Sequence, residues 1–259
     1  MPQESRDLPL PPSWSAAGHA RLPASAMALD GLLQYAPTWN DLPADRYLRD
    51  GGRYRYRRHA CFVHESATAR LELAPHRAHW QSTLYNALHG GMQRWFEPIE
   101  PALAGSDALA QLLRLLGEVF AAARPAPRWY VEAHQFRIDT AEGIGRPTPE
   151  GAHRDGVDFV AIVLVRRDPL RGGETRVFPA QGALGGERFT MREPGETLLL
   201  DDTRVIHETT PIQPPEPAAS GPGANVPGAN APIPAARGPS GVRDTLVLTY
   251  RAGGFQGPG

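Results

Sequence analysis

The sequence predicts a mainly β protein with flanking helices, and three observations support that fold class. Apolar runs at 157–165, 197–200 and 246–250 are bounded by turn residues, which is typical of buried strands. Residues 53–58 alternate Arg and Tyr, a pattern that indicates a half-buried strand with the tyrosines inward and the arginines in solvent. Strand-like patterns dominate from Arg128 to Arg251. A chain of 259 residues, 41% of them hydrophobic, is sufficient for one domain with a real core.

Along the chain, residues 1 to about 24 are rich in Pro and Ala, and we expect them to be poorly ordered. A single domain should then occupy 25–259. It should begin with a helix near 25–35, followed by strands between 53 and 73. A second helix is predicted at 107–123, with Ser106 as its N-cap. Its apolar stripe should pack against the sheet and consists of Leu109, Leu112, Leu113, Leu116 and Phe120.

The most informative residues are His153, Asp155 and the distant His207. Side chains at positions i and i+2 of an extended segment share a face, so His153 and Asp155 can bind one ion while Arg154 points away. His207 follows a strand-like run, and the intervening chain has room for three or four strands at a spacing of ~8–12 residues. Two imidazoles and one carboxylate are typical of a non-haem iron(II) site with open coordination positions.

Arg243 and Thr245 open the last strand-like run, at 246–250. An arginine at this position can bind a carboxylate in a bidentate manner, and the Thr hydroxyl two residues later can add a second donor from the same face. This pair therefore predicts an anchor for a dicarboxylate cosubstrate, although Arg251 competes for that role.

Taken in order, these motifs make the chain resemble the iron(II)- and 2-oxoglutarate-dependent dioxygenases. It is most similar to the bacterial subgroup that includes L-isoleucine 4-hydroxylase, over most of residues 54–251. The motifs that carry the resemblance are H153-R-D155, G172-G-E-T-R-V-F178, D201-D-T-R-V-I-H207-E-T-T-P211 and R243-D-T245, together with Q81-S-T-L-Y-N86, G90-G-M-Q-R94 and H134-Q-F-R-I138.

The resemblance implies a double-stranded β-helix of the jelly-roll or cupin-like type. It implies that His153, Asp155 and His207 bind Fe(II), and that Arg243 and Thr245 hold 2-oxoglutarate. The reaction would consume O₂, release succinate and CO₂, and hydroxylate an unactivated C–H of a small-molecule substrate. The subgroup resemblance implies that this substrate is a free L-amino acid or a close derivative.

An amino acid also needs a partner for its carboxylate and an acceptor for its ammonium group. The candidates are Gln135 and Arg137, two positions apart on one predicted strand, and Glu150, in the turn before the metal ligands. Each has a structural alternative. Arg137 could pair with an acidic neighbour such as Asp139, and Glu150 could be a solvated turn carboxylate.

The chain departs from many family members in the long interval between His207 and Arg243. Residues 211–241 are rich in Pro, Gly and Ala, and the tetrapeptide at 222–225 recurs at 227–230. Such a composition cannot bury enough apolar surface to order itself, so we expect a flexible loop there. A loop of this kind would leave the strand pairing, and with it Arg243, in place.

Composition narrows the class of protein further. A net charge of −1 gives no general attraction to nucleic acid or anionic lipid, and no apolar run is long enough to predict a membrane span or a signal peptide. Cys61, the single cysteine, excludes an intramolecular disulfide and cysteine-based metal centres. We therefore expect a cytoplasmic enzyme that binds neither nucleic acid nor membranes; the sequence does not specify its oligomeric state.

Two alternatives remain open at this point. One is a peptide or protein hydroxylase built on the same iron site, and the other is a non-catalytic, cupin-like metal-binding protein. The R-x-T element argues against the second, because a storage protein has no use for a buried cation beside its metal. Zinc sites at His76 with His79, or at His59 with His64, are disfavoured because neither pair has a nearby third ligand.

Overall fold

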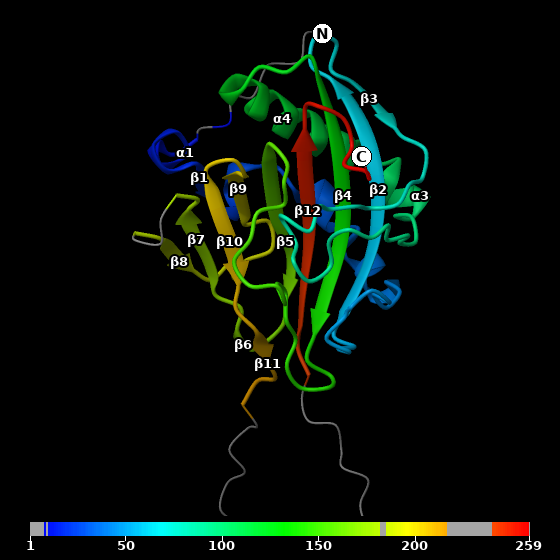
Figure 1. Ribbon diagram of the computed structural model, residues 1–259, viewed down its shortest axis with the longest axis vertical. Coiled ribbons are helices and arrows are strands. Elements are labelled where there is room, and N and C mark those ends of the chain that lie inside the picture. Colours follow the sequence, from blue (N-terminus) through cyan, green and yellow to red (C-terminus); the bar gives the residue numbers. More distant parts are fainter. Residues whose placement is uncertain (1–7, 9, 182–184, 217–239, 259) are drawn as a thin grey trace, which may run out of the picture.

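The computed structural model describes residue 8 and residues 10–181, 185–216 and 240–258 (Figure 1). Within these residues, seven antiparallel strands form a major sheet in the order β1-β9-β5-β12-β4-β2-β3. Their bounds are β1 His19–Leu22, β2 Arg55–Glu65, β3 Arg70–Leu73, β4 Arg128–Asp139, β5 Phe159–Arg167, β9 Thr197–Asp201 and β12 Val242–Arg251.

A smaller sheet has the order β10-β7-β8 and consists of β7 Thr175–Pro179, β8 Glu187–Phe189 and β10 Val205–Thr209. Two short strands, β6 Arg171–Gly172 and β11 Ile212–Gln213, pair with each other. The helices are α1 Pro12–Ala17, α2 Asp30–Leu33, α3 Pro101–Ala104 and α4 Asp107–Ala123, with 3-10 turns at Ala24–Ala26 and Ala36–Asp41.

Helix α4 covers one face of the major sheet (Figure 1). It starts where the sequence predicts, because the Ser106 hydroxyl accepts a hydrogen bond from the Leu109 N–H at 3.2 Å. All five residues of its predicted apolar stripe are buried. They pack with alternate residues of the strands behind them, including Trp129 of β4, Phe159 of β5 and Tyr250 of β12. The stripe therefore anchors the helix to the sheet, as expected.

The other face of β5 and β9 packs against the smaller sheet. Val160, Ile162 and Leu198 from the major sheet share one core cluster with Val177 and Val205 from the smaller one. β5 is buried on both sides by these two cores, which explains why its sequence is apolar at nearly every position. Two facing antiparallel sheets of this kind form a jelly roll, so the predicted fold class is confirmed.

The N-terminal expectation is wrong for the described residues before 25. Residues 12–17 form α1, and β1 pairs with β9 at the edge of the major sheet, His19 opposite Leu200. The cause is a few apolar side chains among the Pro and Ala residues. Trp14 and Leu22 are buried in the main core, where the Trp14 ring lies 6.0 Å from that of Phe120.

Two other expectations need correction. The helix near 25–35 is only the single turn of α2, because Met27 is extended and both Met27 and Leu29 turn into the core. In β2, Arg55 and Arg57 are buried although solvation was expected. Alternation fixes which residues share a face, but it does not decide which face is covered, and here polar partners bury the arginines.

The predicted loop at 211–241 falls largely outside the described residues, which stop at 216 and resume at 240. Its described ends form β11 and lead into β12, and β12 pairs with β4 and β5 along its length. Among the described residues, no helix is long and apolar enough to cross a membrane.

Candidate active site

The structure brings His153, Asp155 and His207 together. One ligand atom from each lies within 4.8 Å of the others. The Nε2 atom of His153 is 3.9 Å from Asp155 Oδ1, and Nε2 of His207 is 3.8 Å from Asp155 Oδ2. All three side chains are at least 84% buried, because their exposed fractions are 10%, 16% and 7%. Two nitrogens and one carboxylate thus converge on one point at the edge of a pocket.

Backbone contacts fix the two histidines relative to each other. His153 precedes β5 and forms an isolated antiparallel bridge with His207 of β10, with hydrogen bonds of 3.1 and 2.9 Å. His153 and Asp155 lie in the loop before β5, which begins at Phe159, and not in the extended segment that the sequence suggested. Nδ1 of His153 lies 2.9 Å from the carbonyl of Gly151, which places a proton on Nδ1 and leaves the Nε2 lone pair facing the site.

The buried carboxylate of Asp202 holds the loop that carries Asp155. It accepts hydrogen bonds from the backbone N–H groups of Asp155, Gly156 and Val157 at 2.9, 2.8 and 3.1 Å. Gly156 has φ +78°, and a Cβ there would lie 2.3 Å from the Tyr85 ring. Glycine at position 156 and the hydrogen bonds to Asp202 together hold the loop in the conformation that directs Asp155 toward the two histidines.

The protonation state of His207 suits metal binding, whereas that of His153 depends on the nearby carboxylates. Burial, with a smaller contribution from His153, holds the pKa of His207 well below its usual range, so that imidazole is neutral and its lone pairs are available. Burial also lowers the affinity of His153 for a proton, but the charges of Asp155 and Glu150 outweigh this effect and raise its pKa. A bound cation would relieve the same negative charge.

Arg243 and Thr245 line the same pocket, together with Val247 and Thr249. These are alternate residues of β12, so they share one face of the sheet. Arg243 is 5% exposed, and no carboxylate among the described residues pairs with it. Burial, and then repulsion from Arg167, lowers its pKa to about 10, so it remains cationic at neutral pH. Arg251, the competing candidate, donates to the carbonyl of Gly254 and does not line the pocket.

Only one of the three predicted substrate-binding residues reaches the pocket. Glu150 lines it, with Oε1 3.6 Å from Nε2 of His153. Gln135 and Arg137 alternate with the pocket-lining residues of β4 and therefore lie on the opposite face. Gln135 donates to the Thr38 hydroxyl at 3.0 Å, and Arg137 pairs with Asp244 at 2.6 Å. The structure therefore places neither Gln135 nor Arg137 in the pocket.

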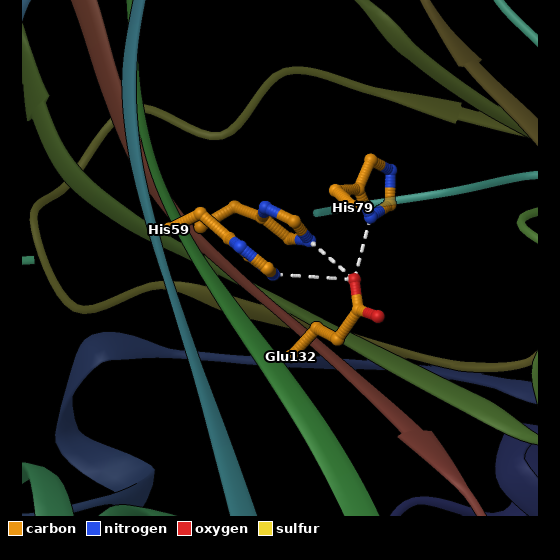
Figure 2. Close-up of side chains that lie close together, drawn as sticks. His59, His79 and Glu132 are labelled. Carbon is orange, nitrogen blue, oxygen red and sulfur yellow. Dashed lines mark hydrogen bonds and ion pairs between the residues drawn. The ribbon is translucent and has the colours of Figure 1, made fainter. Parts of the chain in front are cut away.

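A second polar group, the histidine cluster, consists of His59, His79, Glu132 and His134 and lies on the β2 and β4 side of the pocket. Figure 2 shows His59 and His79 directed at the carboxylate of Glu132. Oε2 of Glu132 is 2.5 Å from Nδ1 of His79 and 3.3 Å from Nε2 of His59. Nε2 of His134 is 3.5 Å away. Burial lowers the pKa of all three histidines, that of His79 to about 3, so they are neutral at pH 7.

Three buried arginines adjoin this cluster: Arg55 and Arg57 of β2, and Arg94. The sequence did not single out these arginines or the histidine cluster as functional. A usable signal existed, because His59 lies two residues after Arg57, and Glu132 and His134 are two residues apart on the neighbouring strand. The register that sets His59 opposite His134 becomes known only from the fold.

Comparisons with known proteins agree with the geometry. A model of the 2OG-Fe dioxygenase family matches residues 36–222, more than half of the chain. The crystal structure of a bsmA homolog from Methylobium petroleophilum PM1 is 50% identical, over 95% of this chain and 93% of that one, with a TM-score of 0.82. A search of curated proteins finds no match.

Two more distant structures share the fold. IDO from Bacillus thuringiensis is 18% identical over 93% of this chain and 96% of its own, with a TM-score of 0.69. TqaL, described as an Fe(II)/(alpha)ketoglutarate-dependent dioxygenase, is 18% identical over 92% of this chain and 84% of its own, with a TM-score of 0.61. At this identity the likeness extends to the jelly-roll fold alone.

Proposed function

Because the chain belongs to the 2OG-Fe dioxygenase family, we propose that it hydroxylates an unactivated C–H of a free L-amino acid or a close derivative. As a member of that family it is an Fe(II)- and 2-oxoglutarate-dependent dioxygenase that uses O₂ and binds a small-molecule substrate. The substrate class and the subgroup that includes L-isoleucine 4-hydroxylase belong to the proposal. They are supported by the ordered motifs between residues 54 and 251.

The observation that carries the proposal is one pocket lined both by the converging donor atoms of His153, Asp155 and His207 and by Arg243, a buried arginine that pairs with no carboxylate of the described residues. We propose that His153, Asp155 and His207 hold the iron, since their donor atoms converge and both histidines can offer a lone pair. We propose that Arg243 and Thr245 hold the distal carboxylate of 2-oxoglutarate. A buried guanidinium without a carboxylate partner gains most from an anionic ligand.

When bound, iron and 2-oxoglutarate supply the oxidising chemistry, in which O₂ is consumed and succinate, CO₂ and a hydroxylated product form. The residues of this chain bind and orient the substrate and the cosubstrate, and they exclude water from the pocket. Val247 and Ile162 give part of the pocket an apolar lining. Glu150 is the proposed acceptor for the substrate ammonium group, since Oε2 is buried without a hydrogen-bond partner among the described residues.

The cytoplasmic location also belongs to this proposal. Cys61 is buried and free, and ferrous iron persists in a reducing compartment.

The test is an aerobic incubation of the protein with ferrous iron, ascorbate, 2-oxoglutarate and a pool of the twenty L-amino acids. Mass spectrometry should detect one amino acid heavier by one oxygen, and succinate in matching amount. His153→Ala should abolish both products. If succinate stays at the no-enzyme level although iron and 2-oxoglutarate bind, a free amino acid is not the substrate.

A further inference from the structure

Positive charge is concentrated where the pocket borders the histidine cluster. Arg55, Arg57 and Arg94 are 5%, 3% and 2% exposed, so all three guanidinium groups are nearly excluded from water. Burying a cation is costly unless a partner compensates it. We therefore asked whether each of the three guanidinium groups has a carboxylate partner.

Two of the three arginines are compensated. Arg55 Nε donates to Asp45 Oδ2 at 2.8 Å, and Arg57 Nη1 is 3.8 Å from the same oxygen. Arg57 also lies over the rings of Phe96 and Phe136, with its guanidinium carbon 3.8 and 4.2 Å from their centroids. A single carboxylate thus serves both guanidinium groups.

Arg94 is different, because no carboxylate among the described residues lies within ion-pair distance of it. Its Nη2 donates to the side-chain oxygen of Gln81 at 2.8 Å, and its buried Nε has no partner within the described residues. A neutral amide cannot balance a buried cation, and the carboxylates of Asp45, Glu150 and Glu132 act on Arg94 only from beyond ion-pair distance. The pocket-lining Arg94 is therefore a built site for an anion.

The neighbouring histidine cluster could instead suggest a second metal ion, since four ligand atoms lie within 4.8 Å. Its surroundings oppose this. Arg57 donates to Nδ1 of His134 at 2.8 Å, which puts the ring proton on Nε2, the atom that faces Glu132. A divalent cation would also be added beside three buried guanidinium groups, where like charges repel strongly in a low dielectric. The charge balance favours an anion.

We propose that Arg94 binds the carboxylate of the substrate, so that the pocket holds two separate carboxylate anchors, Arg243 for the cosubstrate and Arg94 for the substrate. This assignment rests on the proposed function and narrows the substrate to molecules with a free carboxylate. A peptide-bonded residue has an amide at that position and would leave Arg94 uncompensated. Arg94 thus replaces Arg137 as the predicted carboxylate partner.

Gln81 links this anchor to the metal site. Its Oε1 accepts from Arg94, and its Nε2 donates to Asp155 Oδ1 at 3.1 Å. Gln81 is 5% exposed and is held further by Asn86, which donates to Oε1 at 3.2 Å. Gln81 is therefore a positioning residue, which keeps the substrate anchor at a fixed place relative to a metal ligand.

The test measures binding without turnover. The full chain is loaded with Fe(II) and 2-oxoglutarate under nitrogen, and its Tm is followed with a pool of the twenty L-amino acids or with the pool of their carboxamides. The acids should raise the Tm and the amides should not. In Arg94→Gln, the apparent affinity for the acid pool should fall roughly tenfold to a hundredfold. Arg94→Lys, which keeps the charge, should retain part of the preference.

Arg58→Gln is the matched control, because Arg58 follows Arg57 on β2 but pairs with Glu100 away from the pocket. It should behave like the wild type. Equal stabilisation by acids and amides, or by neither pool, overturns the assignment, and so does a second tightly bound metal ion per chain that is lost in Glu132→Gln. Selective binding of the acids without succinate formation in air would support Arg94 as the carboxylate anchor. The same result would contradict the proposed reaction.

Discussion

Arg243 and Arg251 occupy the same strand, but only Arg243 lines the pocket. Arg243→Ala should raise the KM for 2-oxoglutarate about tenfold to a hundredfold, because a charge-assisted hydrogen bond contributes ~1.5–3 kcal/mol. Arg251→Ala removes only a hydrogen bond to the Gly254 carbonyl and should leave that KM unchanged. Steady-state succinate formation measures both values. An equal effect of the two substitutions would remove Arg243 from the cosubstrate site.

Asp202 supports the metal site through the backbone. Asp202→Ala leaves the backbone N–H groups of residues 155–157, which are buried or partly buried, without their acceptor, so it should destabilise the fold by about 1–3 kcal/mol and weaken iron binding. Urea unfolding and iron titration measure the two effects. Thr203→Ala, in the same turn but contacting Asp201, is the control and should leave iron affinity unchanged.

Site residues that lie close together in the sequence could be predicted from it. Arg243 and Thr245 share a face of β12 because they are two apart. His153 and Asp155 converge as the sequence predicted, but through the loop that Asp202 holds and not through strand alternation. Strand alternation also puts Gln135 and Arg137 on one face of β4, but it does not tell which of the two faces lines the pocket, and they lie on the other one. Arg94 could not be assigned at all, since its significance depends on which carboxylates the fold keeps away from it.

At the element scale, α4 docks against β2 through Gly117 and His64. A Cβ on Gly117 would lie 2.3 Å from Nδ1 of His64. Gly117→Ala should therefore destabilise the protein by about 1–3 kcal/mol, although alanine favours a helix by ~1 kcal/mol over glycine. In a His64→Ala background the clash is absent, and the same substitution should be neutral or stabilising. Denaturant unfolding of the four proteins checks this, and equal costs in both backgrounds would contradict it.

His64 also predicts a pH dependence. It is 1% exposed, neither ring nitrogen has a hydrogen-bond partner among the described residues, and burial lowers its pKa. A depressed folded-state pKa means that the unfolded chain takes up a proton first, so stability is full above ~6.5 and falls below it. In His64→Leu the loss of unfolding free energy between pH 7.5 and pH 5 should shrink by up to about 2 kcal/mol. An unchanged pH profile would show that His64 does not contribute.

The elements themselves were predictable where one physical signal dominated. Helix α4 has both a cap and a stripe, and β5 is apolar because it lies between two cores. Residues 12–22 were not predictable, since their order depends on Trp14 and Leu22 meeting a distant core. The average composition of a segment does not determine whether it is ordered. A few large apolar side chains that reach the core can be sufficient to order it.

At the scale of the whole molecule, the proposed ligands connect parts of the chain that are far apart in the sequence. Iron would join the loop before β5 to β10, and 2-oxoglutarate would extend that connection to β12. Saturating Fe(II) and 2-oxoglutarate together, each at about 100 times its Kd, should stabilise the fold by up to ~2.7 kcal/mol per ligand. A chelator should reverse the effect of the metal. Thermal unfolding under nitrogen measures both, and His207→Ala should not respond to iron.

In the proposed reaction, one pocket couples the oxidation of 2-oxoglutarate to the hydroxylation of a free amino acid. Its most direct test is the reaction under oxygen gas enriched in the heavy isotope, with the amino acid pool and mass spectrometry of succinate and product. We expect one heavy oxygen in succinate and one in the hydroxylated amino acid, with the two labelled products formed in equal amounts. Labelled succinate without any labelled amino acid, in the presence of the whole pool, would contradict it.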